Sequence, residues 1–475
     1  MRDASASLSS SSIAPTTAAP PRMAARTKLL LEGPILPTLL RLAAPNILNL
    51  AAFAGVITFD GFFLGHLGTD TLAGASLAFP WVMLLLQTTN SGIGNGVTSA
   101  VARALGAGER DRAAALAFHA LLLALALGAM FAAAMLLGGP FVFAWMGGRD
   151  DMLAAALAYA NVAFGAGVCI CVLNLLGNVV RGTGNMSLPA FVLVGCVLAH
   201  IALAPVLIFG VGPVPAFGPA GAAWGLVIPF GVGGIGMIWY LRSAKAVVRL
   251  RLRGIAPRWE LFAAILRIGV PGMINTTITN LSVVVLTGIA GHLGRETAVG
   301  YAMGARLEYI LQPVAFGFGT AIVALVGTNW GARQYARARE IAWSGAVTVA
   351  AVCGAIGLIV AVRPGLWIGL FSDDPDVARV GALYLHVVGP AYACFGLGLG
   401  LFFVTQGVGR VVAAMNANAI RMAASAGGGL AAIYWLGLGA TGLFAAVACG
   451  FCLYAALLAY TVLRVKVPAA APAKA

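Results

Sequence analysis

The sequence is poor in charge, because charged residues make up only 9% of its 475 residues. Soluble domains carry about 25% charged residues, so this composition excludes a water-exposed globule and, with it, a soluble enzyme. Acidic residues are the scarcest, at 15 against 29 lysines and arginines. The seven cysteines all fall in apolar stretches, which argues against a disulfide framework or a zinc site. We therefore expect no metal and no cofactor.

Long apolar stretches recur along nearly the whole chain. The sequence is 61% hydrophobic, with a mean hydropathy of +0.95. A membrane-spanning helix needs about 20 apolar residues, so the length predicts an all-α polytopic membrane protein with twelve transmembrane helices. The expected spans are 42–66, 72–102, 113–140, 152–180, 187–210, 219–241, 267–291, 297–328, 341–370, 377–407, 412–436 and 440–463.

The basic residues are distributed unevenly over the two sides of these spans. The side that holds both termini carries 24 lysines and arginines, and the opposite side carries four: Arg149, Arg295, Arg363 and Arg379. Under the positive-inside rule this bias places both termini in the cytoplasm. The basic excess is then a topology signal, with membrane lipid as a contact, and no nucleic-acid partner is needed to explain it.

The second half of the chain repeats the first at an offset of 225–226 residues. Each half has six spans, so the repeats are parallel and predict two six-helix bundles related by a pseudo-two-fold axis along the membrane normal. The predicted parts are a disordered tail (1–34), a lobe (35–241), a basic linker (242–266), a second lobe (267–463) and a tail (464–475). Matched segments include Gly65-His-Leu-Gly68 with Gly291-His-Leu-Gly294, Gly106-Ala107 with Gly331-Ala332, and Arg181-Gly-Thr-Gly184 with Gln406-Gly-Val-Gly409.

Only two carboxylates, Asp60 and Glu308, lie well inside the predicted spans. A carboxylate inside the membrane is costly and marks a functional site by default. Asn49 lies on the same helical face as Asp60, and Asn46 extends this polar stripe. The stripe predicts a cation-coupling site at Asp60 and Asn49, with a structural hydrogen-bond cluster as the alternative.

Other polar residues inside the spans are open to two interpretations. Glu308 is either a coupling group or a structural lock between helices, and Arg306 lies on a different face of the same span. His200, in the middle of the fifth span, is able to accept a proton near neutral pH or serves a structural role. Polar residues on the first helix of each half are expected to line a cavity: Asn46, Asn275 and Thr279.

The order and spacing of these landmarks resemble the multidrug and toxic compound extrusion family of secondary transporters, in particular its bacterial DNA-damage-inducible branch. The first span, Pro45…Asp60-Gly-Phe-Phe-Leu-Gly65-His-Leu-Gly68, is similar to the family pattern, as is Arg181-Gly-Thr-Gly184. Ala305-Arg306-Leu307-Glu308 is similar to the eighth span of that branch. The resemblance implies two lobes, alternating access, and export driven by a proton or sodium gradient, with Asp60 as the coupling carboxylate.

The fifth span departs from the family pattern, which often carries an Asn and an Asp four residues apart. His200 and Ala204 stand at these positions. With one carboxylate and one histidine, the sequence favours proton coupling over sodium coupling, because sodium prefers several oxygen ligands.

These observations predict a monomeric antiporter of the bacterial inner membrane that exports small amphipathic, cationic organic compounds in exchange for protons. It is not expected to be an enzyme. The alternatives are sodium coupling and a flippase for lipid-linked saccharides. A flippase would need several arginines in the cavity, and Arg306 is the only arginine that the charge count leaves inside the spans.

Overall fold

A computed structural model describes residues 21–251, 256–370 and 374–465, without the side chains of residues 21–26, 48–58, 61 and 69. This part of the chain is helical and contains no strand. After a short helix, α1 (Pro21–Glu32), two bundles follow, which we call the N-lobe and the C-lobe. The N-lobe contains α2 (Ile35–Gly65), α3 (Thr69–Gln87), α4 (Ile93–Gly106), α5 (Arg110–Trp145), α6 (Asp150–Gly165), α7 (Gly167–Gly182), α8 (Ser187–Phe209) and α9 (Pro219–Arg242).

The C-lobe follows the same order of spans. It contains α10 (Trp259–His292), α11 (Arg295–Gly331), α12 (Tyr335–Val362), the short α13 (Gly365–Ile368), α14 (Pro375–Val388), α15 (Tyr392–Val408), α16 (Val412–Tyr434) and α17 (Gly439–Leu463). A π-helical turn, Thr88–Gly92, joins α3 to α4, and a 3₁₀ turn, Gly389–Ala391, joins α14 to α15. Each of these joined pairs forms one span, so both halves have six.

Nine helices in the described residues are long and apolar enough to cross a membrane, and α6 with α7, bent by 45°, makes a tenth. The two predicted spans outside this set are α2, whose central side chains are not described, and α16, which carries the polar residues Asn418 and Arg421. The predicted fold class, an all-α membrane protein of two six-helix bundles, is confirmed. The largest boundary differences are at the seventh span, where α10 begins at Trp259 rather than at residue 267, and at the ninth, where α12 ends at Val362 rather than at residue 370.

The backbone repeats itself in the two lobes. Gly68 precedes α3 with φ 122° and ψ 162°, and its counterpart Gly294 precedes α11 with φ 121° and ψ 164°. Side chains rarely adopt this positive φ, so glycine is required at both places. The same turn therefore opens the second span of each lobe.

The two lobes meet through glycines near one end of the molecule. A Cβ atom on Gly106 would lie 2.0 Å from the carbonyl oxygen of Thr328, and one on Gly331 would lie 2.1 Å from that of Arg103. Glycine at both positions lets α4 and α11 cross at backbone contact. Ser99 adds a hydrogen bond across the interface, from its Oγ to the carbonyl oxygen of Gln406 at 2.5 Å.

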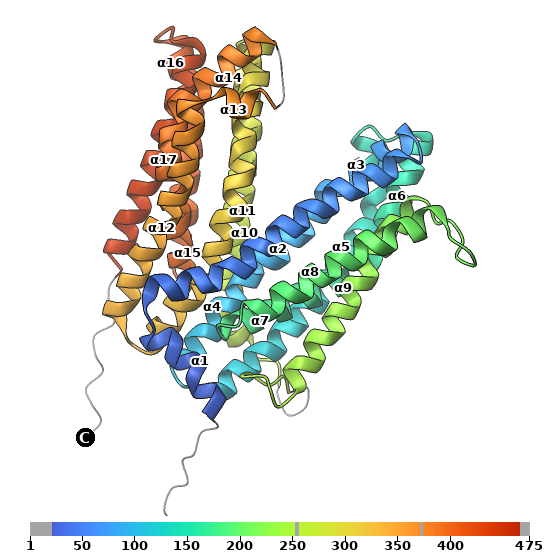
Figure 1. The fold of residues 1–475 in the computed structure, drawn as a ribbon, viewed down its shortest axis with the longest axis vertical. Coiled ribbons are helices and arrows are strands. Elements are labelled where there is room, and N and C mark those ends of the chain that lie inside the picture. Colours follow the sequence, from blue (N-terminus) through green and yellow to red (C-terminus); the bar gives the residue numbers. More distant parts are fainter. Residues whose placement is uncertain (1–20, 252–255, 371–373, 466–475) are drawn as a thin grey trace, which may run out of the picture.

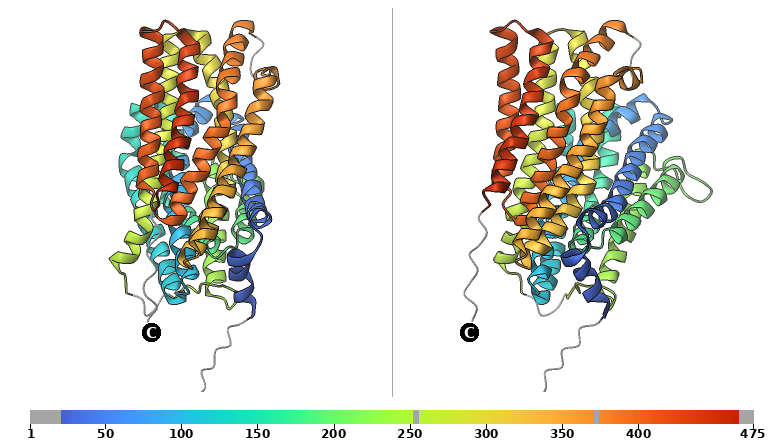
Figure 2. Two further views of the ribbon diagram at one scale, coloured as in Figure 1. Left: turned by 90° about the vertical axis from the view of Figure 1, so that its left-hand side faces the viewer. Right: turned by 60° about the vertical axis from the view of Figure 1, so that its left-hand side comes forward.

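The lobes diverge away from this contact (Figure 1). The C-lobe stands nearly upright in this view, and the N-lobe leans away from it toward the end opposite α1. The C-terminal end of α17 points toward the end at which α1 lies (Figure 2). Because the expected cytoplasmic side is the side of both termini, the lobes part on the expected outer side.

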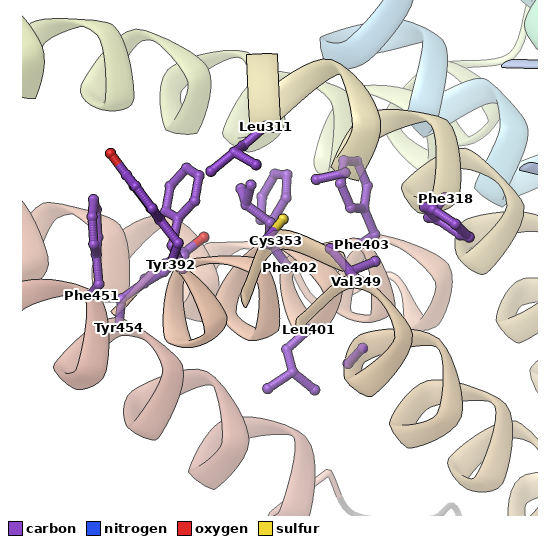
Figure 3. Close-up of a cluster of buried hydrophobic side chains, with 14 of the residues drawn as sticks. Leu311, Phe318, Val349, Cys353, Tyr392, Leu401, Phe402, Phe403, Phe451 and Tyr454 are labelled. Carbon is purple, nitrogen blue, oxygen red and sulfur yellow. The ribbon is translucent and has the colours of Figure 1, made fainter. Parts of the chain in front are cut away.

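Each lobe contains one of two hydrophobic cores, which overlap at the interface between the lobes. Leu39 and Leu42 of α2 belong to the C-lobe core, and Leu261 and Ile265 of α10 belong to the N-lobe core. In the C-lobe core, aromatic side chains from α15 and α17 lie beside aliphatic ones from α11 and α12 (Figure 3). Two largely separate cores allow each lobe to move as a unit against the other.

Two regions differ from the sequence predictions. Residues Pro21–Glu32 of the expected disordered tail form α1, and Asn329 on α11 donates a hydrogen bond to the Leu30 carbonyl oxygen at 3.0 Å. The rest of that tail, residues 1–20, lies outside the described residues. Arg181 and Arg421, which the charge count placed with the cytoplasmic side, lie inside α7 and α16 and are buried, each 3% exposed. Both guanidinium groups donate to neutral amide oxygens, which lowers the cost of their burial.

Candidate functional site

Asp60 and His200 form a buried pair in the N-lobe. Asp60 lies near the C-terminal end of α2 and His200 in the middle of α8, two helices that pack together. The Nε2 atom of His200 lies 2.9 Å from Oδ1 of Asp60, at hydrogen-bond distance. Asp60 is 5% exposed and His200 is fully buried. The structure thus joins the coupling carboxylate expected from the sequence to the histidine that departs from the family pattern.

A small cavity lies beside this pair. It has a volume of about 290 Å³, and Asp60, Ser76 and Tyr159 supply its polar lining. The Nδ1 atom of His200 has no hydrogen-bond partner among the described residues. The pair is therefore able to exchange a proton with water in the cavity through Asp60, while the imidazole stays inside the lobe.

Asn49 was predicted to share this site. It lies on α2, but its side chain is outside the described residues, so its partnership with Asp60 stays a prediction. Tyr159 was not predicted, because a single tyrosine on a mostly apolar helix carries no signal of its own.

Glu308, the second carboxylate, lies in the C-lobe among hydrogen-bond donors. It is 4% exposed, and the hydroxyl of Tyr384 donates to its Oε1 at 3.0 Å. Gly304 on α11 makes this approach possible, because a Cβ there would lie 2.1 Å from the ring of Tyr384. The hydroxyl of Tyr392 lies 3.4 Å from that of Tyr384 and continues the chain of hydrogen bonds. Three elements, α11, α14 and α15, are thereby fastened together.

Arg421 supplies the positive charge of the C-lobe interior. Its guanidinium interacts electrostatically with Glu308 and donates to Oδ1 of Asn418 at 2.8 Å and to Oγ of Ser282 at 3.0 Å. The rings of Phe451 and Tyr454 face the same group, with their centroids 5.6 and 6.0 Å from Cζ. This network ties α16 to α10 and α17.

The remaining predicted residues are distributed over three environments. Arg306 is exposed on the outer surface of α11, on a different face from the buried Glu308. Asn275 and Thr279 face α16, where Asn418 Nδ2 donates to the Asn275 carbonyl oxygen and to Thr279 Oγ1. Asn46 alone of the three predicted cavity residues lines the cavity between the lobes.

That cavity, which we call the central cavity, lies between the N-lobe and α11 and has a volume of about 240 Å³. Phe230, Tyr309 and Phe316 provide aromatic walls, and several amide side chains provide its polar surface. Arg181 also lines it, which sequence reasoning missed because the residue was assigned to a loop. A cavity with apolar walls and a few polar groups, placed where two lobes meet, is typical of a binding site for a small organic molecule.

Comparison with known proteins identifies the family. The family model MatE matches residues 45–206 and 271–427, one segment in each lobe. The chain belongs to the MATE family. This confirms the family predicted from the sequence, whose members are transporters; the assignment to its DNA-damage-inducible branch stays a prediction.

Bacterial relatives cover most of the chain. An "FAD transporter" of Shewanella oneidensis is 28% identical, over 78% of this chain and 81% of its own length. A "Probable multidrug resistance protein NorM" of Thermotoga maritima is 25% identical, over 70% of this chain and 71% of its own. The protein is thus a polytopic membrane protein among bacterial transporters of this family.

Solved MATE structures share the fold. The structure "Crystal structure of MATE in the bent conformation" matches with a TM-score of 0.84 at 21% identity, covering 92% of this chain and 96% of that one. A transporter from Pyrococcus furiosus, whose title speaks of "Reverse polarity of binding pocket", matches with a TM-score of 0.82 at 22% identity, over 92% and 96%.

Proposed function

We propose that this MATE transporter exports small amphipathic organic compounds across the bacterial cytoplasmic membrane in exchange for protons. The observation that carries the proposal is the buried Asp60–His200 pair beside a cavity in the N-lobe. Asp60 takes up a proton from the outer side and releases it toward the cytoplasm. Alternating access arises when the two lobes, each with its own core, rock about the glycine contact of α4 and α11.

Coupling requires that substrate distinguish the two protonation states of Asp60. A ligand with equal affinity for both states shifts no equilibrium. A local change in α2 on protonation supplies this difference, because α2 carries both Asp60 and Asn46, and Asn46 lines the central cavity. Protonation of Asp60 thereby alters the cavity at Asn46, which lies earlier in the same helix.

The Asp60 site suits a proton better than a sodium ion. Hard cations such as Ca²⁺ and Mg²⁺ are bound by several oxygen ligands, and sodium shares this preference. Asp60 is bonded to an imidazole nitrogen, which is not such a ligand. Sodium coupling is therefore the second candidate.

The composition of the central cavity gives little support to the flippase alternative. Lipid-linked saccharides carry phosphates that call for several arginines, and the described lining of the central cavity contains one, Arg181. The name of one relative, "FAD transporter", widens the range of candidate substrates to phosphate-bearing compounds.

The experiment that tests this function is efflux from proteoliposomes under imposed gradients. With an inward-directed proton gradient and no sodium, the protein should drive a loaded dye uphill. With an inward-directed sodium gradient at uniform pH it should not. The reverse pattern would replace proton coupling by sodium coupling, and activity under neither gradient would refute antiport.

The charge bias supports the proposal that both termini lie in the cytoplasm. Cysteine substitution near Arg249, followed by labelling of intact cells with an impermeant maleimide, tests this orientation. The site should be labelled only after the cells are opened, and strong labelling from outside would reverse the orientation.

A further inference from the structure

The charge and the hydrogen-bonding groups of the central cavity are those of an anion-binding site. Amide and hydroxyl groups make up most of its polar lining, and in the described part of the chain Arg181 is the only charged side chain there. No aspartate or glutamate is among these lining residues. The polar uncharged residues are Asn46, Gln87, Asn90, Ser91, Asn95, Asn174, Gln312 and Thr320.

The guanidinium of Arg181 is buried without a countercharge. Its Nη1 donates to Oδ1 of Asn90 at 2.8 Å and to Oδ1 of Asn178 at 3.4 Å. No carboxylate oxygen lies within 4.0 Å of it in the described residues, and its Nε has no acceptor there. A buried charge is costly unless it is paired, so this group lacks the partner that an anion would supply.

The internal repeat shows that the fold does not require this charge. Gln406 stands at the position of the second half that corresponds to Arg181, and it too is buried at the end of its span. Both helix ends present the negative end of a helix dipole. Since one lobe builds this helix end with a neutral amide, a function other than folding explains the arginine in the other lobe.

Hydrogen-bond donors and aromatic rings share the lining. The amide groups of Asn90, Asn95, Asn174 and Gln312 and the guanidinium of Arg181 carry N–H groups, and Phe230, Tyr309 and Phe316 form the walls. Such N–H groups match the oxygens of a phosphate or carboxylate, and the aromatic walls match a planar ring.

We infer that the central cavity binds an organic anion, a molecule with an aromatic body and a phosphate or carboxylate group, which Arg181 recognises. This inference rests on the proposed export function, whose substrate class it names. It replaces the expectation of a cationic substrate, which came from the family resemblance. A cation would meet the guanidinium of Arg181 and no carboxylate among the described lining residues.

Three compounds that share the naphthalene ring and carry substituents of different charge test this inference: 2-naphthyl phosphate, 2-naphthol and 2-naphthyltrimethylammonium. Binding to the full-length protein in phosphatidylcholine nanodiscs is measured by calorimetry, without any gradient. The phosphate should bind tightest and the ammonium compound weakest. Tightest binding of the ammonium compound would overturn the inference.

Variants then assign the preference to Arg181. Arg181→Gln copies the second half of the repeat and should weaken binding of the phosphate by about tenfold to a hundredfold, with the affinity for 2-naphthol unchanged. Arg110→Gln, which removes the same charge from an exposed position, should change neither affinity. An unchanged affinity of Arg181→Gln for the phosphate would refute the role of this residue.

If Arg181→Gln does not fold, Arg181→Lys keeps the charge and loses the two-pronged geometry. It should still prefer the phosphate over the ammonium compound, with weaker binding than the wild type, and a reversed preference would overturn the inference.

A lipid headgroup is a second source of the same anionic chemistry. Replacing part of the phosphatidylcholine by phosphatidylglycerol distinguishes the two sources. Competition that weakens naphthyl phosphate binding in the wild type, but not in Arg181→Gln, would identify the lipid as an occupant of the anion site. Unchanged binding would leave the soluble anion as the ligand. These binding measurements use no gradient. A negative efflux result would therefore not affect the inference of anion binding, and a negative binding result would not affect the proposal of proton-driven export.

Discussion

The two lobes share one backbone plan but have different buried chemistry. In the N-lobe, the carboxylate of Asp60 has an imidazole partner and borders a cavity. In the C-lobe, Glu308 lies inside a network that includes Tyr384 and Arg421 and fastens several helices together. A group that must gain and lose a proton needs access to water, whereas a group that holds helices together needs a full set of partners. From this difference we propose that coupling belongs to the N-lobe and rigidity to the C-lobe.

The largest effect is expected from Asp60→Asn, which imitates the protonated carboxylate and preserves its volume. The variant should fold and insert normally but lose gradient-driven efflux in proteoliposomes. Its substrate affinity should also lose its dependence on pH, because the amide neither binds nor releases a proton. Uphill efflux at the wild-type rate would assign coupling to another site and contradict the proposed difference between the lobes.

A second large effect is expected where the lobes touch. In Gly106→Ala the new Cβ would press against the Thr328 carbonyl and force α4 away from α11, at a cost of about 1–3 kcal/mol. Efflux should fall while each lobe keeps its core, as measured by transport and by cysteine accessibility along α4. Gly138→Ala is the control, because nothing lies within 4 Å of a Cβ there. Equal efflux in the two variants would show that the lobes do not rock about this contact.

Glu308→Gln should lower stability more than transport. The amide keeps the shape and can accept from Tyr384, but it loses the charge that faces Arg421, which should cost about 2 kcal/mol of unfolding free energy. Thermal unfolding in detergent and efflux per folded molecule measure the two quantities separately. Normal stability with abolished transport would move Glu308 into the coupling mechanism.

The smallest effect is expected from Tyr384→Phe. It removes one hydrogen bond to Glu308 at 3.0 Å and should cost about 1 kcal/mol, again with normal efflux. Tyr159→Phe is the matching change in the N-lobe, beside Asp60. The proposal that coupling belongs to the N-lobe is supported if Tyr159→Phe alters the pH dependence of efflux while Tyr384→Phe does not.

The spans and the repeat could be predicted, because long apolar stretches and matched glycines such as Gly68 and Gly294 are visible in the sequence without knowledge of how the helices pack. Asp60 could be found because a carboxylate in an apolar stretch stands out. Arg181 was misplaced because its amide partner Asn90 meets it only after the helices pack. Arg421 has one partner three residues earlier on its own helix, Asn418, but its second partner, Ser282, is brought to it only by packing.

The partners of Glu308 were hidden for the same reason. Tyr384 lies 76 positions away along the chain, and no pattern in the sequence joins the two residues. Helix α1 was missed because the composition of the tail resembles that of a disordered segment.

The most direct test of the division between the lobes is to count protons released when substrate binds. The purified protein is mixed with a transported compound in weakly buffered solution, and a pH-indicator dye reports the release. The wild type and Glu308→Gln should release protons to the same extent, and Asp60→Asn should release none. Release that persists in Asp60→Asn and disappears in Glu308→Gln would contradict the account and assign coupling to the C-lobe.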